Sequence, residues 1–258
     1  MTGRHDETID ELRHWHLRLV QKRSGYRFSL DPLLLCDFAT VGEGARVIDL
    51  GTGSGIIPLV LARKSESATF VGLERQEEMA ELAWRNAALN GLDARVSIVT
   101  GDVADVRKMF PVSSFDLVVA NPPYRRRGTG RVSPRAGRDT ARHESTATLA
   151  DFLAAAKFLV RPAGTICFIY HPLRLPELFA EAALLKLSIL RLRMVHGSET
   201  AEARMFLVEM AKGRRGELQV LPPLFVNGGG PSGDPRGDAD DGSERNFREM
   251  KGNLNAKR

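Results

Sequence analysis

The residues with the most distinctive chemistry in this 258-residue chain are four consecutive ones, Asn121, Pro122, Pro123 and Tyr124. They follow residues 115–120, an apolar run whose length and β-branched content are typical of a strand buried on both faces. Proline donates no hydrogen bond and disfavours a helical conformation in the residue before it, so we expect the strand to end at Asn121 and to continue into a stiff loop. An amide, carbonyl groups without competing N–H donors and an aromatic ring suit a planar target that carries an NH2 group. These four are the candidate catalytic residues, and an ordinary strand-to-loop turn is the alternative interpretation.

A glycine-rich turn at residues 51–55 forms a second candidate site, between a predicted strand at 46–50 and a helix that begins near residue 56. Glycines let the backbone turn sharply and approach a ligand closely, and the helix N-terminus presents free N–H groups. The spacing is GxGxG with an aspartate two residues before the first glycine, whereas dinucleotide-binding folds use GxGxxG. A purely structural strand-to-helix corner would need similar glycines. The candidate cofactor-binding residues here are Asp49, Gly51, Thr52, Gly53 and Gly55.

Two further acids follow predicted strands. Glu74 ends the strand at 68–73, where an acid can accept both hydroxyls of a ribose, and Asp102 follows the strand at 95–99, where it could accept the amino group of an adenine. Their alternative roles are a helix-start acid and a turn acid. Because open α/β sheets bind ligands at the carboxyl ends of parallel strands, we expect all these segments to meet at one edge. The cofactor set is completed by Glu74, Arg75, Asp102, Val103 and Asn121.

Directly after Tyr124 the chain becomes basic, with seven arginines within residues 125–142. Gly, Ser, Thr and Pro separate them, which predicts a flexible loop beside the candidate catalytic residues. Such a loop is typical of a phosphate-binding arm. An overall preference for arginine over lysine is the alternative explanation, but that preference would give only about two arginines in such a window. His143 follows and could contact a substrate, but a lone histidine is more often hydrogen-bonded within a loop or at a helix entry. The candidate RNA-binding residues are Arg125, Arg126, Arg127, Arg131, Arg135 and His143.

Composition narrows the class of protein. With 43% hydrophobic residues and a net charge of +5, the chain can bury the core of one α/β domain and weakly favours acidic partners. Cys36 and Cys167 lie far apart without metal-ligand spacing, which argues for a reducing compartment and against a structural metal. No signal peptide or membrane-spanning run is visible, so a cytoplasmic protein is expected. The sequence carries no signal for an oligomeric state.

The predicted elements alternate between strands and helices, which favours an α/β fold with a Rossmann-like, doubly wound, mostly parallel sheet and an antiparallel last strand. Further strands are expected at 15–20, 26–28, 165–170, 188–195 and 204–210, the last two as a hairpin. Further helices are expected at 31–39, 76–90, 148–160 and 176–186, with Asp31 as the N-cap of the first and Thr148 and Asp151 as a capping box. Residues 1–14 are expected to be loose, and Pro162–Gly164 to form a turn.

The expected organisation has three parts. An N-terminal extension with a short hairpin and a helix spans residues 1–40, and a catalytic domain spans 41–226. A tail at 227–258 is rich in Gly, Pro and Asp with almost no apolar residues up to about residue 245, so most of it is expected to be disordered.

Together the motifs at 49–55, 74, 102 and 121–124 resemble the signature of class I S-adenosylmethionine-dependent methyltransferases that act on exocyclic or amide nitrogens. Residues 24–31 and 141–144 resemble, more narrowly, the bacterial family that methylates the 6-amino group of adenine-37 in a valine tRNA. The resemblance runs from about Gln21 to Val226, and 247–250 look like the family's carboxyl end after an acidic, glycine-rich insertion.

The resemblance implies S-adenosylmethionine as cofactor and an RNA substrate, namely tRNA near the anticodon. By analogy, the glycine turn and Asp49 would hold the methionine end, Glu74 the ribose and Asp102 the adenine. Asn121 and the Pro122 carbonyl would accept both hydrogens of the target amine, and Tyr124 would stack on a flipped-out base. Neither a metal nor a membrane is implied.

Other functions share some of these features. An enzyme for a ribosomal RNA amine, a DNA amine or a protein glutamine amide could use the same chemistry, although the known glutamine enzymes resemble one another in a longer N-terminal domain. A nicotinamide enzyme is disfavoured by the GxGxG spacing and the proline loop. A non-catalytic RNA-binding module would not require the strand-end acids together with Asn121.

Overall fold

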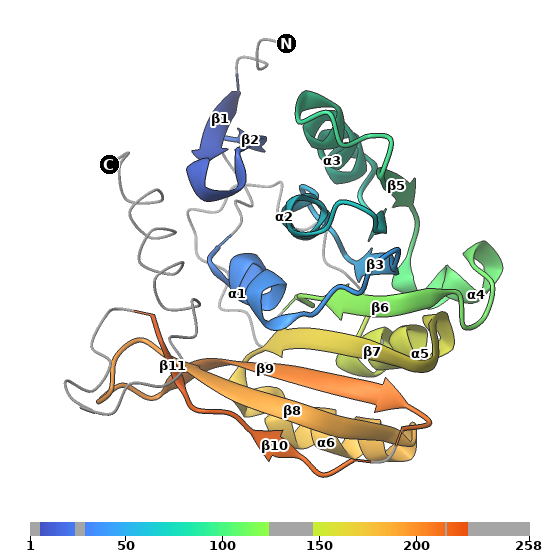
Figure 1. Cartoon of the computed structure of the whole chain (residues 1–258), viewed down its shortest axis with the longest axis vertical. Coiled ribbons are helices and arrows are strands. Elements are labelled where there is room, and N and C mark those ends of the chain that lie inside the picture. The colour runs from blue at the N-terminus through green and yellow to red at the C-terminus, as the bar shows by residue number, and fades with distance from the viewer. Residues whose placement is uncertain (1–5, 24–28, 124–146, 215, 227–258) are drawn as a thin grey trace, which may run out of the picture.

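The computed structural model of the protein describes residues 6–23, 29–123, 147–214 and 216–226 (Figure 1). Several sequence-based expectations lie outside these residues, namely the short strand at 26–28, Tyr124, the arginine-rich loop with His143, and the C-terminal tail.

A central sheet organises the described residues, with strand order β10-β8-β9-β7-β6-β3-β4-β5 and β11 paired with β8. From β7 through β6, β3 and β4 to β5 every neighbouring pair is parallel, whereas β9 runs antiparallel to both β7 and β8. This confirms the predicted fold class with its antiparallel last strand. The bounds are β3 Arg46–Leu50, β4 Thr69–Glu74, β5 Val96–Thr100, β6 Phe115–Ala120, β7 Val160–Tyr170, β8 Leu187–His196, β9 Ala203–Lys212, β10 Gln219–Val220 and β11 Leu224–Phe225. The two-residue strands β10 and β11 are too short to give a sequence pattern and were not predicted.

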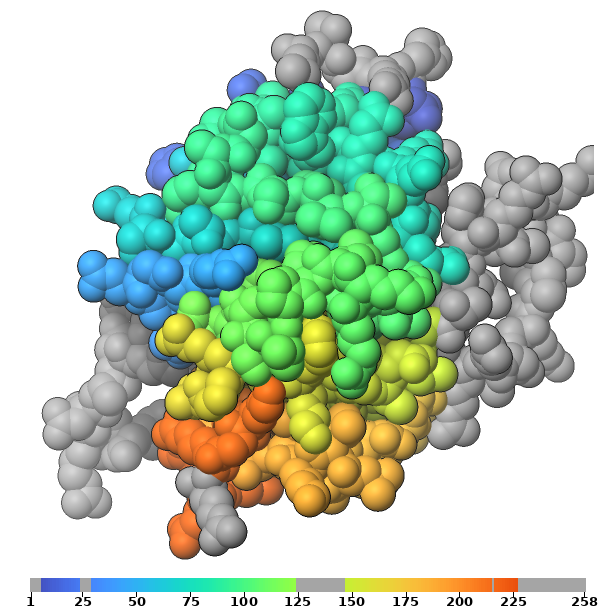
Figure 2. Space-filling view, turned by 90° about the vertical axis from the view of Figure 1, so that its right-hand side faces the viewer, coloured from blue at the N-terminus to red at the C-terminus, as the bar shows by residue number. Residues whose placement is uncertain are grey.

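Helices cover both faces of this sheet (Figure 1). Alternation along the strands separates two cores, since Val47 and Leu117 face one and Ile48 and Val118 face the other. The first core includes residues of α1, α2 and α3, and the second includes residues of α4, α5 and α6. The bounds are α1 Asp31–Phe38, α2 Ile56–Lys64, α3 Glu77–Leu89, α4 Val106–Met109, α5 Leu149–Leu159 and α6 Leu175–Leu184. In the space-filling view of Figure 2 the coloured bands follow the same order as the sheet, from the α3 region at the top to the β8–β10 region at the bottom.

The N-terminal segment differs from its prediction. Residues expected to be loose form β1 (Glu7–Leu12), which pairs antiparallel with β2 (Leu17–Lys22). The first residues of the strand predicted at 15–20 lie instead in a 3₁₀ turn, where His16 has a φ of 50°. Leu17 and Leu19 are buried in the first core together with residues of α1 and α2. The hairpin is therefore packed onto the domain, and its polar β1 gave no apolar pattern to read.

Two other boundaries also differ. Strand β7 begins at Val160, and the predicted turn at 162–164 is an irregularity within it, where Ala163 has a φ of 63°. Gly164 is needed because an added Cβ would lie 2.7 Å from the carbonyl oxygen of Asp116. Helix α1 begins at Asp31 itself, with Leu30 rather than Asp31 in the N-cap position. The capping box of Thr148 and Asp151 on α5 is confirmed.

Candidate functional site

The carboxyl ends of four parallel strands lie side by side at one edge of the sheet. Leu50 at the end of β3 is paired with Leu73 of β4 and with Ala120 of β6, and Glu74 at the end of β4 is paired with Thr100 of β5. The structure therefore gathers at this edge the sequence-predicted residues Asp49, Gly51, Thr52, Gly53, Gly55, Glu74, Arg75, Asp102, Val103, Asn121, Pro122 and Pro123.

The turn after β3 depends on backbone conformations that favour glycine. Gly51, Gly53 and Gly55 have φ angles of 76°, 57° and 84°. The carbonyl oxygen of Leu73 accepts hydrogen bonds from the N–H groups of Gly51 and Thr52, at 2.8 and 3.0 Å. The turn is thus fastened to the neighbouring strand and leads directly into the N-terminus of α2, which presents unpaired backbone donors.

Glu74 connects this turn to the next helix. One carboxylate oxygen accepts from the N–H of Gly53 and the other from the N–H of Gln76, each at 2.9 Å. The residue is 8% exposed. An ionised carboxylate has about four acceptor positions, so hydroxyl donors of a ligand can still bind beside these two amides.

Buried oxygens without hydrogen-bond partners face the turn. Within the described chain this holds for both carboxylate oxygens of Asp49 and for the hydroxyls of Thr52 and Ser54. Native proteins rarely leave such groups unsatisfied, because burying an unpaired polar group costs free energy. A cluster of acceptors next to a glycine turn fits a ligand that supplies a positive charge and N–H donors, such as the ammonium group of an amino acid moiety.

The electrostatics of Asp49 agree with this interpretation. Burial raises the pKa of its carboxyl group from 3.8 to about 7, the Thr52 hydroxyl opposes the rise, and the nearby Glu74 carboxylate adds to it. The ionised form is therefore costly in the ligand-free protein. A cation placed beside Asp49 would remove that cost.

The acid after β5 is held differently. Asp102 accepts a hydrogen bond from the N–H of Ala104 at 2.9 Å and caps the 3₁₀ turn that begins at Val103. Its other oxygen lies 3.8 Å from Nε of Arg75. Val103 is buried in the second core. Asp102 therefore fills the turn role that the sequence also allowed, and it keeps a partly exposed position at the rim of the edge.

The part of the edge that follows β6 consists of Asn121, Pro122 and Pro123. Asn121 is partly buried, Pro122 is buried and Pro123 is exposed. The phenol of Tyr170, at the end of β7, donates a hydrogen bond to the Pro123 carbonyl oxygen at 3.2 Å. Burial raises the pKa of Tyr170, so its hydroxyl stays a donor. The guanidinium of Arg174 lies 5.9 Å from the centre of the Tyr170 ring.

Two residues of this region were not found by sequence reasoning. Tyr170 ends an apolar strand and looks like any other core residue. Asn86 lies on α3, is fully buried and donates a hydrogen bond to the carbonyl oxygen of Ser54 in the glycine turn. Its sequence signal is limited to one residue of low helix propensity inside a predicted helix.

The remaining predicted site residues lie outside the described residues, namely Tyr124, Arg125, Arg126, Arg127, Arg131, Arg135 and His143. Among the residues that the structure describes, no three His, Cys, Asp or Glu side chains are grouped so as to hold a metal ion. In the same residues no helix has the length and apolar character needed to cross a bilayer.

Comparison with known proteins agrees with this geometry. The family described as "Methyltransferase domain" matches residues 42–203. A tRNA1(Val) (adenine(37)-N6)-methyltransferase of Porphyromonas gingivalis strain W83 is 34% identical over 191 residues, which cover 71% of this chain and 73% of the relative. A protein of the same name from Aeromonas salmonicida is 32% identical over 148 residues, 57% of this chain and 60% of the relative.

A solved structure shows the same fold. A predicted O-methyltransferase from Agrobacterium tumefaciens superposes with a TM-score of 0.65 and 22% identity, covering 85% of this chain and 96% of that one. The sequence similarity is thus in agreement with the glycine turn, the strand-end acids and the order of the sheet, and all of them fit one family. The chain belongs to the methyltransferase-domain family and, within it, to the family of the tRNA1(Val) (adenine(37)-N6)-methyltransferases.

Proposed function

We propose that this protein transfers the methyl group of S-adenosylmethionine to the exocyclic 6-amino group of an adenine in tRNA, close to the anticodon. The observation that carries the proposal is the pairing of β3 with β6, in which Leu50 lies opposite Ala120. The glycine turn and the Asn121 loop therefore leave adjacent strand ends. A methyl donor held by the first lies next to an amine held by the second.

On the cofactor side, buried acceptors would bind the methionine end. Asp49 would pair with its ammonium group, and the turn's N–H groups would bind its carboxylate. Glu74 would accept the ribose hydroxyls and Asp102 the adenine amino group. The bound cofactor supplies a methyl group on a positively charged sulfur, which is a good leaving group. The three carboxylates also complement that charge.

On the acceptor side, the protein would act through neutral groups. The Asn121 side-chain oxygen and the Pro122 carbonyl would accept the two hydrogens of the amine and so localise its lone pair, which is otherwise delocalised into the ring. Pro122 and Pro123 lack N–H donors that would compete for these positions. Tyr124 would stack on the flipped base. Positioning and fixed dipoles would supply most of the acceleration, without a strong base.

The substrate assignment is supported by the two relatives, both tRNA1(Val) (adenine(37)-N6)-methyltransferases by name. To test it, the enzyme would be incubated with deuterium-labelled S-adenosylmethionine and transcripts of valine tRNA, ribosomal RNA and DNA. Nuclease digestion and mass spectrometry would then locate the label. We expect 6-methyladenosine at position 37 of the tRNA, and no product when that adenine is replaced by guanine. Label in ribosomal RNA or DNA alone would contradict the assignment.

The arginines that follow Tyr124, within residues 125–142, would bind phosphates of the tRNA backbone. Replacing Arg126, Arg127, Arg131 and Arg135 together should weaken RNA binding and spare the cofactor. If about three of these side chains contact phosphates, the slope of log affinity against log salt should flatten by roughly two units. Fluorescence anisotropy would measure RNA affinity of wild type and variant across a range of salt concentrations. Equal slopes for the two proteins would mean that the arginines bind no phosphate.

A further inference from the structure

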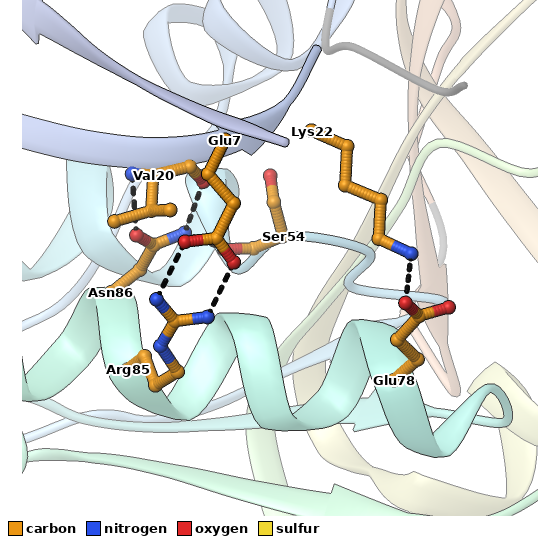
Figure 3. Close-up of polar contacts among 7 residues, drawn as sticks. All are labelled: Glu7, Val20, Lys22, Ser54, Glu78, Arg85 and Asn86. Atoms are coloured by element: carbon orange, nitrogen blue, oxygen red, sulfur yellow. Dashed lines mark hydrogen bonds and ion pairs between the residues drawn. The ribbon is translucent and has the colours of Figure 1, made fainter. Parts of the chain in front are cut away.

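Two asparagine side chains, Asn86 on α3 and Asn90 directly after the end of that helix, complete the free edge of the N-terminal hairpin. The N–H of Val20 donates to Oδ1 of Asn86 at 2.8 Å, and Nδ2 of Asn86 donates to the carbonyl oxygen of Val20 at 3.2 Å (Figure 3). One helical turn later, Asn90 makes the same pair of bonds with Arg18, at 2.9 and 2.8 Å. The carboxamides thus pair with β2 as a neighbouring strand would.

The spacing of the two asparagines explains why this match works. Val20 and Arg18 are two residues apart on β2, so both turn their backbone groups to the same edge, away from β1. Residues four apart on a helix are separated by about 6 Å along its axis, and residues two apart on a strand by about 6.8 Å. Asn86 and Asn90 therefore fit successive backbone sites. They also protect a strand edge that would otherwise be open to other chains.

Asn86 has a second contact that Asn90 lacks. Its remaining amide hydrogen is donated to the carbonyl oxygen of Ser54, in the glycine turn, at 3.0 Å. Asn86 is 0% exposed, and its oxygen and both amide hydrogens are used. The hydroxyl of Ser54 is one of the buried oxygens without a partner in the described chain. A single buried amide therefore holds the hairpin and the candidate cofactor loop at once.

Ion pairs fasten the open end of the hairpin independently of that loop. The carboxylate of Glu7 on β1 accepts two hydrogen bonds from Arg85 on α3, at 2.6 and 2.8 Å, and Lys22 on β2 pairs with Glu78 (Figure 3). Glu7 and Arg85 are largely buried, with side chains 5% and 15% exposed. These contacts dock the hairpin firmly, and the hydrogen bond from Asn86 to Ser54 extends the docking to the glycine turn.

We propose that the hairpin is a working part of the cofactor site and that Asn86 is the positioning residue that links them. A ligand in the glycine turn stabilises the docked hairpin, and the docked hairpin holds the turn in its binding conformation. The two effects are equal by thermodynamic reciprocity. This inference rests on the proposed function, because it takes the turn to be the binding site of S-adenosylmethionine.

Hydrogen exchange on the whole chain tests the link. Exchange would be followed by mass spectrometry with and without saturating S-adenosylhomocysteine, the demethylated product. We expect the ligand to slow exchange in the turn at residues 51–59 and also in the hairpin at residues 7–22. Slowing in the turn with an unchanged hairpin would overturn the link and leave the proposed function intact. If calorimetry showed no binding of the product or of S-adenosylmethionine, both would be overturned.

A matched pair of variants identifies the residue. Asn86→Ala and Asn90→Ala each remove one pair of side-chain hydrogen bonds to β2, but only Asn86→Ala also loses the contact to Ser54. Asn90→Ala should speed hairpin exchange in both states and keep the ligand-induced slowing, with ligand affinity within about twofold of wild type. Asn86→Ala should lose the ligand-induced slowing and bind about tenfold more weakly, a usual size for coupled sites.

Equal behaviour of the two variants would overturn the role of Asn86. Should Asn86→Ala fail to fold, Asn86→Ser replaces it, and the wild-type exchange experiment remains decisive for the link itself. A conservative Asn86→Gln variant that recovered part of the coupling would support positioning by the carboxamide.

Discussion

The cofactor half and the acceptor half of the site share one sheet edge but use opposite chemistry. The ends of β3, β4 and β5 carry the carboxylates Asp49, Glu74 and Asp102. The end of β6 continues instead into an amide and two prolines, with a carbonyl that is held by the phenol of Tyr170. Three carboxylates are concentrated on the first half, whereas Asn121, Pro122 and Pro123 on the second carry no side-chain charge.

This difference explains how one scaffold could bind a cationic cofactor and a neutral amine side by side. Carboxylates on the cofactor half would complement the positive charge of the cofactor. Neutral oxygens on the acceptor half would accept the hydrogens of the amine without adding charge there. If the two halves act separately, substitutions on them should change different measured quantities.

The largest effect is expected at Asn121. Asn121→Ala removes an acceptor that would act on the amine as its lone pair attacks, so turnover should fall by roughly a hundredfold or more. Affinity for S-adenosylhomocysteine should stay near wild type. Single-turnover methylation of tRNA and calorimetry measure the two quantities. A rate within a few-fold of wild type would refute the lone-pair role, and Asn121→Asp shows whether an added charge restores activity.

Substitution of Glu74, on the cofactor half, should change cofactor affinity more than turnover. Glu74→Ala should weaken cofactor affinity by about 1.5–3 kcal/mol, the usual loss for hydrogen bonds to a charged group, and leave the rate at saturating cofactor closer to wild type. Glu74→Gln is the matched control, because its oxygen can still accept from one of the two backbone amides. Calorimetry of the folded variants decides, and unchanged affinity in Glu74→Ala would exclude the ribose contact.

The pH dependence of cofactor binding tests Asp49. With a pKa of about 7 in the ligand-free protein, this carboxyl is mostly protonated below pH 7, and a cationic ligand must bind its ionised form. Affinity should therefore rise by about tenfold per pH unit between pH 5.5 and 6.5 and level off above 7. Calorimetric titrations across this range would measure it, and Asp49→Asn should abolish the slope.

The same pKa makes a prediction about stability. Because the folded chain binds the proton more tightly than the unfolded one, this group favours folding at low pH, and its contribution is lost as the pH rises through about 7. Asp49→Asn should accordingly raise the melting temperature of the ligand-free protein at pH 8 and change it little at pH 4. A lower melting temperature at pH 8 would show that the charge is compensated within the protein.

The smallest effect is expected at Tyr170. Tyr170→Phe removes the hydroxyl that holds the Pro123 carbonyl but keeps the buried ring. One hydrogen bond contributes about 1 kcal/mol, so turnover should fall about fivefold while cofactor affinity is unchanged. Loss of cofactor affinity instead would mean that the halves are not separate at this point.

Local patterns were sufficient to predict the sheet edge and most of its residues. Apolar runs that end in Asp49, Glu74 and Asn121 identify buried parallel strands, because burial on both faces leaves polar residues only at the ends. The hairpin could not be predicted in the same way. Strand β1 is polar, and the residues that hold the hairpin, Arg85 bound to β1 and Asn86 bound to β2, lie far away in the sequence.

Two further features depended on tertiary contacts. The start of β7 at Val160 follows from its pairing with Phe115, which overrides the local turn signal of Pro162 and Gly164. The double role of Glu74, as a strand-end acid and as an acceptor for Gly53 and Gln76, follows from the shape of the turn and not from its spacing.

The most direct test of the division between the halves is a calorimetric titration of S-adenosylhomocysteine into Asp49→Asn and Asn121→Ala, side by side at pH 7.5. We expect Asp49→Asn, which keeps the size of the side chain and removes its charge, to bind at least about tenfold more weakly than wild type. Asn121→Ala should bind within about threefold of wild type. Wild-type affinity in Asp49→Asn, or a loss confined to Asn121→Ala, would contradict the account.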